Sequence, residues 1–600
     1  MRPSLFTGLP AFTFLFALCT AVPAWARGTI DRVEIRGLEA SGDRPLEDNV
    51  RLALGVHQEI GKVTGESRLE FLLLNAEREA RQALEPFGYY SPTITVDSPR
   101  DANDRIVVVV HVDKGEPVRV RGSNVAILGP GGEDQYLARD LAAFRPRVGE
   151  QFNHGTYEAS RDGIGRRLAE RGYFDADFME REVRVTRADF AADIDLVWDS
   201  GFRYDMGPTT FHQDFFRPGL LDKLVTWEEG SYFHQGKLDR LRQSLVKLDY
   251  FSAIDIQPLT DQATDDLRVP IDVTLALAKR TVYTAGLSYG TESGMGVRFG
   301  MERRYVNDRG HKLVTDVDYA QNRKNLLVQY RIPAFAWLDG WYTGAFSAYD
   351  EQTDYIDFRN VRLLASRSGE LTDRWTATAS LIALRERWSY DMDADTGQRL
   401  YTYSTLFYPE VTGSYIGVDN RLFPRHGLSL NLATRAGSEA LGSDTNFLQG
   451  WASGTWFQGV GEADRLIVRG EAGATWTSDL VAMPPSLRFF AGGDRSIRGY
   501  AWREVGPRTP PPDNFAIGGR YVVTGSVEYE HYFNAGPWGM AGFVDAGDAF
   551  DSPSEFDLRV GVGVGARWRS PIGGVRIDIA HGLDDPDSSF QIYLSLGANL

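Results

Sequence analysis

Hydrophobic positions follow two different periodicities along the chain, and the change falls near residue 280. Before this point, apolar residues recur at spacings of three and four, which is typical of amphipathic helices. After it, apolar and polar residues alternate, which is typical of β-strands with two different faces. We therefore expect an α+β region that ends at Lys279 and an all-β region over residues 280–600.

The first region contains one pattern three times, with a period of roughly 80 residues. In each copy a helical stretch ends in an aromatic pair, and short strands precede and follow it. The aromatic pairs are Tyr89-Tyr90, Tyr173-Phe174 and Tyr250-Phe251, and the helical stretches before them carry apolar residues from Leu69 to Leu84, from Ile164 to Leu168 and from Leu238 to Leu248. The three copies open with strands at 33–35, 118–120 and 202–204. They close with strands at 105–112, 193–198 and 268–277. This predicts three modules of strand-helix-helix-strand-strand order, over residues 27–114, 115–200 and 201–279. We interpret the aromatic pairs as core residues of their own modules.

The second region alternates strand by strand. Over residues 560–568, one face consists of Val560, Val562, Val564, Ala566 and Trp568, and the other consists of Gly561, Gly563, Gly565 and Arg567. Over residues 521–530, one face consists of Tyr521, Val523, Val527 and Tyr529, and the other consists of Thr524, Ser526, Glu528 and Glu530. In the same way, Val575, Ile577 and Ile579 alternate with Arg576 and Asp578. Charges on one face, with Trp or Tyr at strand ends, are typical of a barrel with a polar lumen and a lipid-facing apolar surface. We expect an antiparallel transmembrane β-barrel of about sixteen strands, because single-chain barrels of this class favour even numbers and an open edge cannot face lipid.

The connections support this order when the first strand, 281–289, starts from the periplasm. The short turns then fall on the periplasmic side, and the longer connections fall outside. The short ones are 307–310, 536–539 and 570–574, and the longer ones include 391–400 and 548–557. By the same count, the stretch from Pro484 to Gly519 is an extracellular connection between strands eleven and twelve. It carries Arg498 among aromatic residues, and we expect it to fold into the lumen, which a barrel of this size otherwise fills with water.

The N-terminus predicts export, and no motif predicts catalysis. Arg2, an apolar stretch over residues 12–18 and Ala24-Trp25-Ala26 indicate a signal peptide, residues 1–26, which contains the single cysteine, Cys19. The net charge of −17 argues against a nucleic-acid partner. We find no zinc-protease helix motif, no serine-hydrolase elbow and no nucleotide loop, since the Gly561 to Gly565 run lies within an alternating strand. We therefore expect a protein that is not an enzyme and has no cofactor or metal.

Two sequence motifs lie at a fixed distance from each other in the β-region. Ser496-Ile497-Arg498-Gly499-Tyr500 follows Gly492-Gly493-Asp494, and Phe543-Val544-Asp545-Ala546-Gly547 comes two strands later. These motifs resemble the outer-membrane assembly-factor superfamily, the BamA/TamA or surface-antigen family, and residues 419–427 resemble the family's turn after strand eight. The three modules resemble polypeptide-transport-associated (POTRA) modules, and their number with the barrel is similar to the TamA branch, the barrel subunits of translocation and assembly modules. The resemblance covers essentially the whole mature chain.

The resemblance implies that the long loop is locked inside the lumen by an ion pair between Arg498 and Asp545. The lock would comprise Arg498, Gly499, Tyr500, Phe543, Asp545 and Gly547. Alternation agrees, because Phe543, Asp545 and Gly547 share one face. Glu528 and Glu471 remain alternative partners for Arg498.

The resemblance also implies a function in assembling and inserting outer-membrane barrels or autotransporters. Clients would enter through a lateral seam between the first and last strands, at Val282, Tyr283, Leu287, Ile592, Leu594, Leu596 and Gly597. The chain ends in Leu600, where such barrels generally end in Phe or Trp, and we expect a loosely paired closing strand. The implied partners are unfolded barrel or autotransporter clients, an inner-membrane-anchored TamB-like protein and outer-membrane lipid. The location would be the outer membrane of a Gram-negative bacterium, with the modules in the periplasm.

Two other functions remain open at this point. A two-partner-secretion transporter would export a polypeptide through the lumen, although such proteins usually carry two modules and a plug helix. A porin or adhesin with a periplasmic tether belongs to a different class, and three modules with a docked loop argue against it.

Overall fold

The computed structural model describes residues 27–40, 42–100, 105–290, 294–335, 340–352, 356–390, 400–510, 514–571, 573–584 and 590–597. The expected signal peptide with Cys19, most of the expected 391–400 connection and residues 598–600 lie outside this part of the chain. None of the helices in the described ranges is both long and apolar enough to cross a membrane.

The first module is a four-stranded sheet with two helices. It consists of β1 (Arg27–Arg36), α1 (Arg44–Ala53), β2 (Val63–Gly65), α2 (Glu66–Leu84), β3 (Thr93–Asp97) and β4 (Ile106–Asp113), with sheet order β2-β1-β4-β3. Leu72, Ala76 and Leu84 of α2 are buried in the same core as Tyr89. The apolar spacing in α2 therefore has the role expected from the sequence.

The second module has a three-stranded sheet, in the order β5-β7-β6, and two helices. Its elements are β5 (Arg119–Leu128), α3 (Gln135–Ala142), α4 (His154–Glu170), β6 (Asp177–Thr186) and β7 (Ala191–Asp199). Side chains of Asp134 and Asn153 accept hydrogen bonds from backbone N–H groups in the first turns of α3 and α4, which defines where these helices begin. Tyr173 is buried in the core of this module.

The third module departs from the expected order. It contains β8 (Asp205–His212), α5 (Gln235–Leu248), β9 (Phe251–Pro258) and β10 (Arg268–Leu277), with sheet order β8-β10-β9. A 3-10 turn, Asp222–Leu224, stands before α5 where the other modules have an α-helix. The expected strand at 202–204 is wrong, because Tyr204 N–H bonds the Gly172 carbonyl and Tyr204 C=O accepts from Phe233, so β8 begins one residue later.

The chain divides into two compact units, and the division crosses the third module. One unit is Met1–Pro208 with Trp227–Asp239 and Pro258–Ile271, and the other is Thr209–Thr226, Arg240–Gln257 and Asp272–Leu600. In the second unit, Tyr250 is fully buried and its hydroxyl donates to the carbonyl of Gly310, in the turn after the second barrel strand. Part of the third module is therefore built into the same unit as the barrel.

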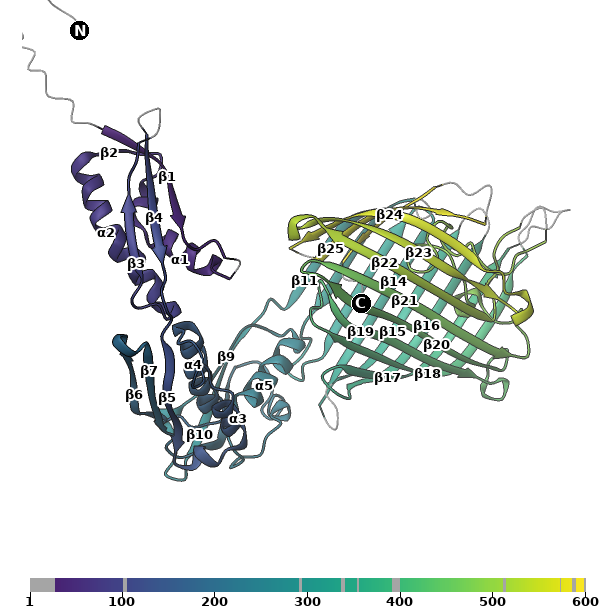
Figure 1. The fold of residues 1–600 in the computed structure, drawn as a ribbon. Helices are drawn as coiled ribbons and strands as arrows, with labels where there is room; N and C mark the ends of the chain where they lie inside the picture. The colour runs from purple at the N-terminus through teal and green to yellow at the C-terminus, as the bar shows by residue number, and fades with distance from the viewer. Residues whose placement is uncertain are drawn as a thin grey trace, which may run out of the picture. The chain divides into compact units, whose positions relative to one another are not determined.

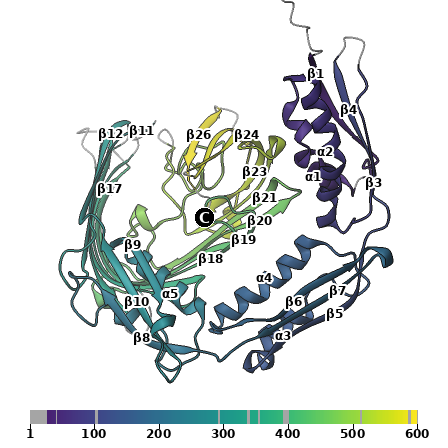
Figure 2. The same ribbon diagram turned by 90° about the vertical axis from the view of Figure 1, so that its left-hand side faces the viewer.

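The β-region is one antiparallel sheet of sixteen strands that curves into a barrel (Figures 1 and 2). Its strands are β11 (Thr281–Gly290), β12 (Gly294–Arg303), β13 (Lys312–Ala320), β14 (Arg323–Ala334), β15 (Gly340–Gln352), β16 (Asp357–Glu370), β17 (Trp375–Ser389), β18 (Thr402–Val418), β19 (His426–Gly437), β20 (Phe447–Val460), β21 (Asp464–Thr477), β22 (Tyr521–Tyr532), β23 (Trp538–Phe550), β24 (Arg559–Ser570), β25 (Gly573–Gly582) and β26 (Gln591–Leu596). Each strand pairs with its neighbours in chain order. The expected fold class, α/β modules followed by a sixteen-strand antiparallel sheet, is confirmed, although the third module departs from the expected element order.

The order of the strands places the short and long connections at the positions expected from the sequence. The three short turns join even to odd strands, and the connection between β21 and β22, the eleventh and twelfth strands, is the long loop. The faces also agree with the alternation, since Glu528 and Glu530 of β22 are buried whereas Val527 and Tyr529 are exposed on the opposite face. The chain's longest loop and its inward charges therefore belong to one region of the barrel, around β21 to β25.

Candidate functional site: a loop docked inside the barrel

The tip of the long loop is a compact turn with its own hydrogen bonds. Ala491 and Val505 form an isolated β-bridge that closes the tip. Gly492 and Gly493 have φ values of 97° and 101°, a backbone conformation that favours glycine. The Gly493 N–H then bonds the carbonyls of Ile497 and Tyr500. This geometry presents Arg498 at the end of the turn.

Arg498 is only 1% exposed and meets Asp545 of β23 through three hydrogen bonds. Its Nε lies 2.7 Å from Oδ2, its Nη2 lies 3.0 Å from Oδ1, and its backbone N–H bonds the same Oδ2 at 3.0 Å. The guanidinium carbon also lies 3.3 Å from the centre of the Phe543 ring. A bidentate pair of this kind fixes the orientation of the loop as well as its position.

The same guanidinium reaches two further carboxylates. Its Nη1 lies 2.7 Å from Oε2 of Glu528 and 3.1 Å from Oδ2 of Asp578. Glu528 is thus a partner in addition to Asp545. Glu471, the other alternative, instead accepts a hydrogen bond from the indole of Trp451 at 2.7 Å.

Arg567 of β24 is a second buried cation in this network. Its guanidinium contacts Glu528 at 2.7 Å, Glu530 at 3.0 Å and Asp578 at 2.6 Å. Arg498 and Arg567 therefore share Glu528 and Asp578, and neither arginine can be lost without leaving buried carboxylates short of a partner. Such a change costs several kcal/mol, typically about 3–5.

Glycines on the barrel wall make room for the tip. A Cβ at Gly561 of β24 would lie 1.8 Å from the carbonyl oxygen of Arg498, and one at Gly582 of β25 would lie 2.7 Å from the Tyr500 ring. A Cβ at Gly499 would in turn lie 2.5 Å from the backbone of Gly582. The loop backbone therefore approaches β24 and β25 more closely than any other residue type would allow. Gly547 of β23, with φ 152°, instead lies against Val523 and Thr524 of β22.

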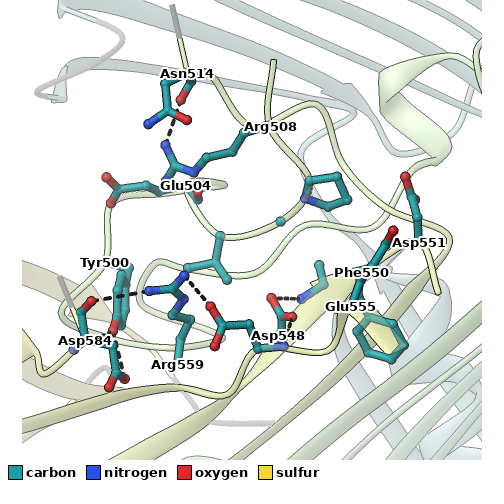
Figure 3. A pocket seen from close by; sticks show the side chains of 15 residues that line it. Tyr500, Glu504, Arg508, Asn514, Asp548, Phe550, Asp551, Glu555, Arg559 and Asp584 are labelled. Atoms are coloured by element: carbon teal, nitrogen blue, oxygen red, sulfur yellow. Dashed lines mark hydrogen bonds and ion pairs between the residues drawn. The ribbon is translucent and has the colours of Figure 1, made fainter. Parts of the chain in front are cut away.

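Tyr500 forms part of the wall of a cavity of about 780 Å³, which residues 504–508 of the loop also line (Figure 3). Its hydroxyl lies 3.4 Å from a carboxylate oxygen of Asp584 and accepts a hydrogen bond from the Asp584 N–H at 3.3 Å. Six of the other fourteen lining residues are acidic and two are arginines, of which Arg559 contacts Asp557 and the Asp584 carbonyl. The tyrosine thus extends the docking of the tip from β23 and β24 to the end of β25.

The loop's first part has a separate anchor on the far wall. The buried Glu386 of β17 accepts hydrogen bonds from the Ser486 hydroxyl at 2.6 Å and its N–H at 3.2 Å, and Gln449 of β20 donates to the Leu487 carbonyl at 2.7 Å. Met483 and Leu487 are buried among inward apolar residues of β17 and β18. The loop is therefore held at both sides of the barrel.

The expected seam residues lie on the two end strands. Tyr283, Leu287, Ile592 and Leu594 are 65%, 90%, 71% and 67% exposed, on the outward face. Val282 is partly buried and pairs with Glu302, and Gly597 follows β26 and donates to the Gly574 carbonyl. Leu596 belongs to β26, and its side chain lies outside the described atoms. In the described residues β11 pairs only with β12, and β26 only with β25.

Comparison with known families finds a match in each of the two regions of the chain. Residues 306–599 match the model of the Omp85 superfamily domain, and residues 32–114 match the model of POTRA domain TamA domain 1. The chain carries an Omp85 superfamily domain. The second match lies within the expected first module, and the first match lies within the expected barrel but begins after β12.

Relatives and a solved structure agree with this family. The outer membrane protein assembly factor BamA of Nitratidesulfovibrio vulgaris is 24% identical over 372 residues, which cover 60% of this chain and 46% of the relative. The protein of the same name from Neorickettsia risticii is 22% identical over 527 residues, covering 83% and 68%. This chain thus spans less than half the length of the first relative. The crystal structure of BamA from Haemophilus ducreyi lacking POTRA domains 1–3 has a TM-score of 0.63 at 17% identity, covers 80% of this chain and 99% of its own, and shows the same fold.

Within this Omp85 domain, sequence reasoning missed Arg567, Asp578 and the anchor at Glu386. Alternation placed Arg567 and Asp578 on the inward face, which was the available signal. No described group of three or more His, Cys, Asp or Glu side chains could hold a metal ion. The site is thus a docking site for the chain's own loop, built from ion pairs and close backbone contacts.

Proposed function

We propose that this protein assembles barrel proteins at the outer membrane by pairing client strands with the edges of β11 and β26. The observation that carries the proposal is a barrel that matches the Omp85 superfamily domain over residues 306–599 and whose strand ladder begins at β11 and ends at β26, without mutual pairing of these two strands in the described residues. Unpaired edge N–H and C=O groups can add a strand from another chain. Within a bilayer these groups must find partners, so an incoming client strand satisfies both sides.

The energy for insertion comes from the client. Each client strand gains backbone hydrogen bonds and buries apolar side chains in lipid. Tyr283, Leu287, Ile592 and Leu594 are the outward residues beside the seam, and they would contact either lipid or the client's own outward face. Val282, Leu596 and Gly597 complete the edge that the client meets.

The docked loop stabilises the strands next to the seam. Arg498, Gly499 and Tyr500 contact β23, β24 and β25, the strands that precede β26. Asp545 and Phe543 provide the matching surface on β23, and Gly547 of the same strand lies close to Val523 and Thr524 of β22. Loss of this dock would loosen the wall on which the last strand depends.

The match of the first module to a TamA-type POTRA domain supports the TamA branch of the family. On this assignment the clients are autotransporters and related barrels, the modules lie in the periplasm, and an inner-membrane-anchored TamB-like protein is the partner. The modules offer sheet edges, such as β6, for extended polypeptides.

Insertion in liposomes tests the proposal. An unfolded autotransporter barrel is added to liposomes that contain the purified protein, and folding is followed by heat-modifiable mobility. Liposomes with an equal amount of a sixteen-strand porin are the control for bilayer disturbance. Faster folding than with the porin supports an assembly factor, whereas equal rates contradict it and favour a transporter that exports through the lumen.

A further inference from the structure

We propose that Tyr593 couples the docked loop tip to the last strand, so that undocking of the tip releases β26 from the barrel. This inference rests on the proposed seam and names the residue that controls it. Docking of the loop tip on β23 to β25 and pairing of β26 at the seam would then depend on each other.

β26 is the shortest strand of the barrel in the described residues. It is six residues long, and the only strand that pairs with it in the described residues is β25, along Gln591 to Leu596. Ile592 and Leu594 point outward, so the inward contacts of the strand depend on Tyr593 and Ser595. A short edge strand of this kind is easily lost unless something else holds it.

The hydroxyl of Tyr593 bonds the loop tip twice. It accepts the N–H of Gly499 at 3.1 Å and donates to the carbonyl of Tyr500 at 2.8 Å. Ser595 adds a longer contact of 3.5 Å to Asp494, also in the tip. The tip backbone can reach this tyrosine because Gly499 has φ 103° and no side chain against β25.

The two bonded groups follow Arg498 directly in the chain, so they move with it. Arg498 also contacts Asp578 of β25, and Asp578 is the register partner of Tyr593. Arg498, Asp578 and Tyr593 therefore lie at one level of the barrel on three neighbouring parts: loop, β25 and β26. Undocking of Arg498 removes both hydrogen bonds to Tyr593 at once.

The coupling acts in both directions. If tip docking stabilises β26, displacement of β26 by a client strand must weaken tip docking by the same factor. A client would thereby loosen the loop, and a docked loop would keep the resting seam ordered. This gives the lumen loop a defined effect on the edge where clients add.

Hydrogen exchange of the backbone amides in 590–597 tests the coupling in detergent micelles without any client. Tyr593→Phe keeps the ring and removes both hydrogen bonds, and we expect exchange there to become about tenfold faster, which corresponds to about 1.4 kcal/mol. Arg498→Ala should accelerate exchange at least as much, and Tyr593→Phe should add nothing in that background. Tyr529→Phe is the matched control, because its hydroxyl donates to Asp464, away from the loop.

Each outcome decides the proposal. Unchanged exchange in Tyr593→Phe, or additive effects of the two substitutions, would overturn it. Heat-modifiable mobility verifies that each variant is folded; if Arg498→Ala does not fold, Gly561→Ala displaces the tip without removing a charge. If the hydrogen-exchange result shows coupling but the protein does not accelerate client insertion in liposomes, the proposed function is wrong and this inference stands. If the protein accelerates insertion but the exchange result shows no coupling, only this inference is wrong.

Discussion

Replacing Gly561 by alanine should undock the loop tip without changing any charge. Gly561 faces inward on β24, directly opposite Asp545, and its added Cβ would lie 1.8 Å from the Arg498 carbonyl oxygen. Ordinary contact requires about 3.4 Å, so the loop must retreat by about 1.6 Å. The β24 backbone cannot give way instead, because it pairs with β23 and β25 on both sides.

The retreat breaks the bond between the Arg498 N–H and Asp545, which is 3.0 Å long in the docked loop. An added 1.6 Å or so takes it beyond hydrogen-bond distance. Overpacking of this size costs about 1–3 kcal/mol. The population with an undocked tip should therefore rise about 5- to 150-fold.

Trypsin provides the assay, because the tip contains Arg495, Arg498 and Arg503. Cleavage of a transiently open segment follows its open population when closing is fast. Gly542→Ala is the matched control, since a Cβ on this β23 glycine meets nothing within 4 Å. Equal cleavage in Gly561→Ala, Gly542→Ala and the parent protein would refute the close approach of the tip to β24.

Two further substitutions test the charge network and the outer surface. Arg567→Met removes a buried cation that three carboxylates share and should lower the free energy of unfolding of the barrel by about 3–5 kcal/mol, measured by urea titration of heat-modifiable mobility. The control is Arg559→Met, which changes a more exposed arginine and should cost under about 1 kcal/mol. Equal effects of the two substitutions would contradict a special role for Arg567. Val564→Arg places a charge on the outward face of β24 and should destabilise the protein in liposomes by about 2–4 kcal/mol if it lies near the bilayer centre, and an unchanged midpoint would show that this face does not contact lipid.

Alternation made the barrel predictable, because inward and outward residues differ in chemistry at every second position. It correctly separated Phe543 and Asp545 from Val544, and it placed the long loop between the eleventh and twelfth strands. Both results require only local pattern and chain order. Register across strands is not visible in such a pattern.

The parts that sequence reasoning missed depend on that register. Arg567 and Asp578 were both predicted to face inward. Only the strand pairing from β22 to β25 shows that Arg567 contacts Glu528 and Asp578, and that Asp578 also contacts Arg498. Glu386 precedes Ser486 by a hundred residues, and the barrel's curvature brings them together. The third module was mispredicted at 202–204 because extended residues there bond loop backbone instead of a strand.

The most direct test of the account is to lock the seam and measure client insertion. Since Cys19 is the only cysteine, pairs introduced at Leu287 or Ala285 and at Ile592 or Leu594 can be joined selectively by a reducible bismaleimide. The control pair is Val527 and Val544, which are outward, in register and away from the seam. The account predicts that the seam lock abolishes accelerated insertion, that reduction restores it, and that the control lock has no effect. Full acceleration by the seam-locked protein would contradict it.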